Sequence, residues 1–79
     1  MCAKQSITLK PAELGPRLLD RSPERTTAED AAGQLTRFLG RRRPALLALL
    51  NIEPAEGAVR VTARGKHPGE ALRELRELL

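Results

Sequence analysis

Three consecutive arginines, Arg41 to Arg43, stand directly before an apolar run in the stretch FLGRRRPALLALLNIEP. Guanidinium groups bind carboxylates and phosphates through paired hydrogen bonds. Arginines at the carboxy end of a helix are stabilising, because the helix dipole favours cations there. Arg43, however, also precedes a predicted helix that begins at Pro44, and the amino end of that helix prefers an anion. Helix-end charge therefore explains only part of the cluster. The positive charge that this effect leaves unexplained predicts an anion- or partner-binding site at Arg41, Arg42 and Arg43.

The apolar run that follows is the second feature of this stretch. Four leucines lie within residues 44–50, and a helix this short cannot turn all of them toward one core, so one flank is expected to be exposed or covered by a partner. Apolar anchors beside arginine are typical of protein interfaces. We therefore expect Leu47 and Leu50, with the arginines, to bind a protein partner or a second copy of the chain. The alternative is that this helix is simply central to the core.

Catalytic chemistry has little support in the sequence. His67 is the only histidine and has no acid beside it to orient it as a base, so we expect it to be a surface N-cap or turn residue. Cys2 is the only cysteine, which excludes an intrachain disulfide and a cysteine-based metal site. The turn GKHPG could hold phosphate on its amides but lacks the spacing of a nucleotide-binding motif, so a plain turn is favoured. The sequence predicts no enzyme activity, no cofactor, no metal and no small-molecule substrate.

Composition sets the size and charge of the molecule. The chain has 79 residues, which fits a single domain over residues 1–79, and Phe38 is its only aromatic residue. The formal net charge of +4 favours loose association with polyanions. A second hypothesis is therefore a nucleic-acid-binding protein. It would use Arg41 to Arg43 with Arg60, Arg64 and Lys66, and with so few aromatics it would contact the phosphate backbone rather than stack on bases.

Targeting signals are not recognisable in the chain. The N-terminus lacks the pattern of a secretory signal, and no apolar run approaches the roughly 18 residues of a membrane span. We expect a soluble, cytoplasmic protein with no membrane contact.

Alternating apolar and polar residues predict two strands, one over residues 6–10 and one over residues 58–64. Each has one apolar and one more polar face, which suits an antiparallel sheet covered by helices on one side. Residues 53–57, EPAEG, are interpreted as a turn. Because two strands alone are marginal, a third is expected either in the link over residues 11–26 or from a second copy of the chain.

Apolar stripes predict three helices. The first begins after Thr27 as N-cap and ends at Gly40 in a left-handed conformation. The second runs from Pro44 to about residue 50, and the third from Pro68 to the C-terminus. The link over residues 11–26 is proline-rich and irregular, with at most one helical turn over residues 17–20. The expected class is α+β, a small antiparallel sheet with about three helices on one face.

The segment from Pro44 to Leu79, PALLALLNIEPAEGAVRVTARGKHPGEALRELRELL, resembles the C-terminal half of HPr-type phosphocarrier proteins. That family has a short apolar helix, a turn ending in glycine, a similar strand and a final amphipathic helix. The resemblance implies an open-faced sandwich. The stretch ELGPRLLDRSP lacks the histidine that the family phosphorylates after its first strand, and Ala45 stands where many members carry serine. No functional residue is carried over, and a carrier or regulator without the usual histidine is the third hypothesis.

Overall fold

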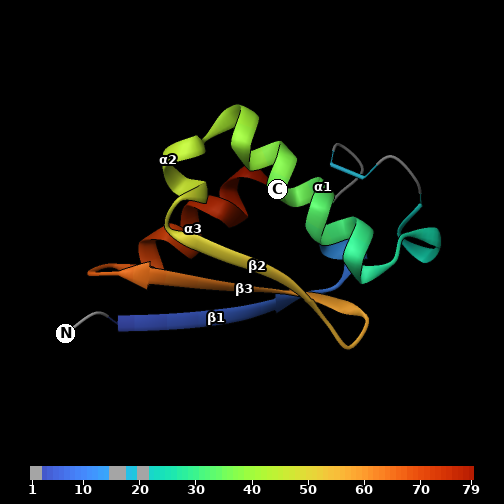
Figure 1. The fold of residues 1–79 in the computed structure, drawn as a ribbon, viewed down its shortest axis with the longest axis horizontal. Helices are drawn as coiled ribbons and strands as arrows, with labels where there is room; N and C mark the ends of the chain where they lie inside the picture. The colour runs from blue at the N-terminus through green and yellow to red at the C-terminus, as the bar shows by residue number, and fades with distance from the viewer. Residues whose placement is uncertain (1–2, 15–17, 20–21) are drawn as a thin grey trace.

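The structure, a computed structural model, describes residues 3–14, 18–19 and 22–79. Its three strands form one antiparallel sheet in the order β1-β3-β2, and the helices lie on one face of this sheet (Figure 1). The elements in chain order are β1 (Ala3–Leu9), the 3-10 helices η1 (Pro11–Leu14) and η2 (Pro23–Arg25), α1 (Ala28–Arg42), α2 (Pro44–Leu47), β2 (Leu50–Ala55), β3 (Ala58–Gly65) and α3 (Pro68–Leu78). The expected α+β class is confirmed.

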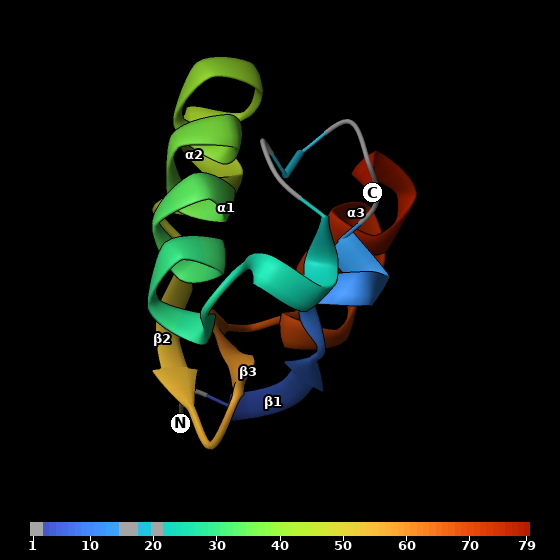
Figure 2. The same ribbon diagram turned by 90° about the vertical axis from the view of Figure 1, so that its right-hand side faces the viewer.

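The central strand β3 contributes the main sheet residues of the hydrophobic core. Val59, Val61 and Ala63 are fully buried and alternate with polar residues, as the sequence predicted for this strand. Leucines from the helices close the core from above, and α1 stands over β2 while α3 stands over β1 (Figure 2). The fully buried leucines of the two helices are Leu35, Leu39 and Leu75.

The third strand comes from neither of the two expected sources. It is β2, formed by the segment for which the sequence predicts the end of a helix followed by a turn. The described residues of the link contain 3-10 turns and no strand. Pro54 hides the strand signal, and it is tolerated because β2 is an edge strand that needs fewer ladder hydrogen bonds. A two-residue turn with positive φ at Glu56 (48°) and Gly57 (78°) joins β2 to β3, which is the geometry that tight hairpins prefer.

The helix boundaries also differ from expectation in one region. Thr27 caps α1 as predicted, since its hydroxyl accepts a hydrogen bond from the Asp30 amide at 3.1 Å. Gly40, by contrast, does not end the helix in a left-handed conformation, because α1 continues to Arg42 and φ at Gly40 is not positive. The helix that starts at Pro44 is only one turn long and ends at Leu47.

The described part of the link packs onto the core. Leu14, Leu18 and Leu19 are buried, and the Thr26 hydroxyl donates to the Ser22 carbonyl oxygen at 2.9 Å. The helical turn expected over residues 17–20 includes positions outside the described residues. The described residues of the link thus contain 3-10 turns and contribute three leucines to the core.

Candidate functional site

The three arginines lie where α1 ends and α2 begins. Arg41 and Arg42 are the last residues of α1, Arg43 separates the two helices, and all three are exposed. The structure thus confirms that the cluster joins a helix carboxy end to a helix amino end. Both helices are packed against each other, and a Cβ at Gly40 would lie 3.6 Å from Cδ2 of Leu47.

The arginines have different local contacts. The Arg42 guanidinium lies over the Phe38 ring, 4.9 Å from its centroid, in a cation–π contact. Arg43 Nη2 lies 3.8 Å from Glu74 Oε2, and both side chains are about half exposed (53% and 50%), so this pair contributes little to stability. Arg41 has no ion pair with any residue that the structure describes. Much of the hydrogen-bonding capacity of the cluster therefore faces solvent.

The leucines after the arginines are divided between core and surface. Leu46 is buried, and Leu47 is partly buried against the core. Leu50 is only 8% exposed because it opens β2 on the face turned toward the helices. The interface role expected of Leu50 is therefore corrected, since its side chain is part of the core. The leucine that reaches solvent is Leu49, which is 48% exposed.

Leu49 was missed because its exposure depends on where α2 ends. A helix continuing to residue 50 would place Leu47 and Leu50 on one flank. With the helix ending at Leu47 and a strand starting at Leu50, Leu49 falls in the turn between them and points outward. A signal for this was available, because LNIEP alternates in the manner of a strand.

Every side chain from Pro44 to Leu50 is apolar, and a large part of this segment is exposed. We name the exposed and partly exposed residues the α2 surface, which consists of Pro44, Ala45, Leu47, Ala48 and Leu49. The arginine cluster borders this surface at one side. The amide of Arg64 donates to the carbonyl oxygen of Leu49 at 3.0 Å, so the end of β3 borders it at another.

The same end of the molecule collects further cations. The start of β1, the end of β3 and α2 all lie at the left in Figure 1. We name this region the basic end. Its cations are all exposed and are Lys4, Arg41, Arg42, Arg43, Arg64 and Lys66. The sequence shows these charges as scattered along the chain, and only the fold brings them together.

The remaining candidates do not assemble into a chemical site. His67 is exposed and occupies the N-cap position of α3, although its side chain makes no capping hydrogen bond, which agrees with the surface N-cap or turn position expected for it. Gly65 ends β3 with a φ of 115°, a conformation that requires glycine. In the described part of the chain, no group of three potential metal ligands comes together, and no buried side-chain polar atom lacks a hydrogen-bond partner.

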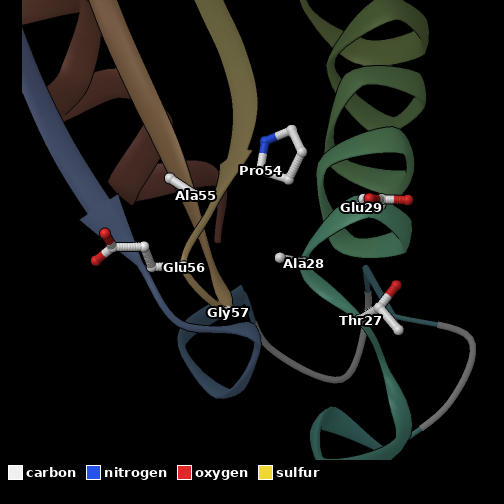
Figure 3. Close-up of a pocket in the computed structure, with 7 residues that line it drawn as sticks. All are labelled: Thr27, Ala28, Glu29, Pro54, Ala55, Glu56 and Gly57. Carbon is white, nitrogen blue, oxygen red and sulfur yellow. The ribbon is translucent and has the colours of Figure 1, made fainter.

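A pocket of about 450 Å³ lies at the opposite end, between the start of α1 and the hairpin that joins β2 to β3. Its two carboxylates, Glu29 and Glu56, point away from each other, and the remaining lining is mostly small or apolar (Figure 3). Its polar groups do not converge as those of a catalytic or ligand site would.

No helix within the described residues has the length and apolar character needed to cross a membrane. In comparisons with protein-family models, curated proteins and solved structures, nothing matched this chain.

Proposed function

We propose that this protein is a small non-catalytic interaction module that binds a protein partner through the α2 surface and the arginine cluster Arg41 to Arg43. The observation that supports the proposal is the exposure of Leu49 within an uninterrupted apolar segment beside three exposed arginines. A lone exposed leucine is ordinary on a protein surface. A half-exposed leucine within a wholly apolar segment, bordered by arginine, has the composition of an interface.

The energies involved indicate what the partner must provide. Since about half of Leu49 is exposed, burying it would contribute about 1 kcal/mol of the 1.5 to 3 kcal/mol for a whole leucine. A complex of micromolar affinity needs about 8 kcal/mol. Hydrogen bonds to charged groups contribute about 1.5 to 3 kcal/mol each, so the arginines must add the larger share. The partner we propose therefore carries an apolar pocket rimmed by carboxylates.

The test uses the purified chain, immobilised, to capture proteins from a cell extract, with Leu49→Ser and Arg41→Gln as interface variants. Ala12→Ser is the matched control, because Ala12 is an exposed apolar residue on η1, outside the α2 surface. We expect a partner that is captured by the wild type and by the control but lost with both interface variants. A set of captured proteins that is the same for all four chains would contradict the proposal.

The partner can also be a second copy of the chain. Light scattering on the purified protein identifies this case, and a dimer that Leu49→Ser converts to monomer would support the same surface. A dimer unaffected by Leu49→Ser would show that self-association uses a different surface.

A further inference from the structure

The sheet has a second face, turned away from the helices, on which polar side chains form rows across the strands. In one row Arg60 lies opposite Glu53, with Arg60 Nη1 and Glu53 Oε1 3.8 Å apart. In the next row Ser6 lies opposite Thr62, and their hydroxyl oxygens are 2.9 Å apart. Each of these two rows therefore contains one favourable interaction between its strands.

The third row differs because Lys4 lies directly opposite Arg64. Like charges placed directly opposite each other on neighbouring antiparallel strands are destabilising. Both side chains are exposed, and neither forms an ion pair with any residue that the structure describes. A local rule broken without a local compensating contact is characteristic of functional positions.

Other charges near this row increase the excess of cations. Lys66 follows β3 two residues after Arg64 and is exposed. The helix α3 packs on both strands of this row. Its acid Glu74 already contacts Arg43, and Glu70 lies in the first turn of α3, in the helix layer rather than on the open face. The open face itself carries one acid, Glu53, which is engaged by Arg60.

Acidic residues gather at the other end of the molecule. They lie on η1, η2, the start of α1 and the hairpin, at the right in Figure 1. These residues are Glu13, Glu24, Glu29, Asp30 and Glu56. The net charge of +4 is therefore unevenly distributed, and the row of Lys4 and Arg64 lies at the basic end.

We infer that Lys4, Arg64 and Lys66 form a second binding site, which lies beside the α2 surface and includes the open face of the sheet, for the phosphate groups of a nucleic-acid backbone. Cross-strand neighbours have Cβ atoms about 4.5 to 5.5 Å apart, so two long cationic side chains can reach adjacent phosphates or share one. The neighbouring positions of the face, Ser6, Thr62 and Asn51, carry hydroxyl and amide groups of the kind that contact phosphate and sugar.

The composition of the open face of the sheet favours nucleic acid over an acidic protein as the ligand. Protein partners need apolar or aromatic anchors, and the described residues of this face near Lys4 and Arg64 offer none. Base stacking needs an exposed aromatic ring, but the only aromatic residue, Phe38, is half-buried beneath Arg42. Binding is thus directed to the backbone and independent of sequence. Three phosphate contacts correspond to a slope of log K against log salt of about −2.7 on duplex DNA.

The test measures binding of a fluorescently labelled mixed-sequence DNA duplex by anisotropy, at salt concentrations from about 50 to about 200 mM. The double variant Lys4→Gln/Arg64→Gln removes two of the proposed contacts, and the slope is expected to fall by about one for each. The double variant Lys10→Gln/Arg25→Gln removes the same total charge at the opposite end, where both residues are exposed. Its slope is expected to stay that of the wild type.

Four outcomes would overturn the inference. One is the absence of any binding by the wild type at about 50 mM salt. Another is an equal loss in both double variants, which would show that only net charge matters. The third is competition by polyglutamate as strong as competition by unlabelled duplex, since the site would then not distinguish nucleic acid from acidic protein. Competition by inorganic phosphate alone, at equal phosphate concentration, would likewise reduce the site to one for the free anion. Leu49→Ser should leave duplex binding unchanged, so failure of the proposed protein partner would not affect this test.

Discussion

Lys4 of β1 and Arg64 of β3 lie directly opposite each other in an antiparallel sheet, although 60 positions separate them in the chain. On the same strand, Arg60 has Glu53 opposite it, within 3.8 Å. The central strand therefore contains an internal comparison, with one arginine in a matched row and one in a mismatched row. The mismatch of Lys4 and Arg64 is a cost in stability that the fold tolerates.

Arg64→Glu should raise the stability of the protein, because it places a carboxylate opposite Lys4. Cross-strand charge pairs are worth roughly 0.2 to 1 kcal/mol, and the gain should diminish at high salt because both positions are exposed. Thermal unfolding followed by circular dichroism at low and high salt measures the effect. Arg60→Glu is the matched control and should lower stability, since it places two carboxylates opposite each other. A decrease in stability for Arg64→Glu at low salt would show that the like-charge row is not destabilising.

Arg64→Glu should also lose duplex binding while remaining folded.

Leu49 and Leu50 are neighbours with opposite expected responses to substitution. Leu49→Ala should change the free energy of unfolding by less than about 0.5 kcal/mol, as surface substitutions usually do. Leu50→Ala should cost about 2 to 5 kcal/mol, because Leu50 is buried in the core. Urea unfolding of the two variants measures the difference. Similar costs at both positions would mean that β2 does not start at Leu50 with the observed register.

Gly40→Ala distinguishes a helix that continues through this residue from one that ends there. Alanine in a helix interior is favoured over glycine by roughly 0.5 to 1 kcal/mol. Its added Cβ would lie 3.6 Å from Leu47 Cδ2, an ordinary contact distance. We therefore expect the variant to be more stable than the wild type in urea unfolding. A destabilised variant would instead support the left-handed stop that the sequence alone suggested.

Glu56 occupies a position that suits another residue better. Its φ of 48° is left-handed, and a residue with a Cβ pays roughly 1 to 2 kcal/mol there, while asparagine is tolerated. Glu56→Asn creates the Asn-Gly pair that two-residue hairpins prefer and should stabilise the protein by relieving part of this cost. Gly57→Ala is the opposite case and should destabilise it, since φ at Gly57 is 78°. Urea unfolding of both variants tests this turn, and an equal effect of the two would contradict it.

Local patterns in the sequence were sufficient to predict the helices and strands whose hydrophobic patterns are long or strongly periodic. The alternation around Val59 and Val61 indicated β3, and apolar stripes with a Thr27 cap indicated α1 and α3. The position of the arginine cluster between two helices was also evident, because capping and charge preferences act over one helical turn. These features depend on residues within a few positions of one another.

Three features depend instead on contacts between segments that are distant in the chain: which segment becomes the third strand, which leucine is exposed and which cations lie side by side. The segment that forms β2 is short, contains a proline and follows a leucine run, so its local signal is ambiguous. Its pairing with β3 makes this segment a strand. As a result, Leu50 is buried and Leu49 is exposed. The opposition of Lys4 and Arg64 depends on the register between β1 and β3, which hydrogen bonds between distant segments establish. The cluster of arginines is evident from neighbouring positions in the chain, whereas the second group of cations beside it depends on the strand register.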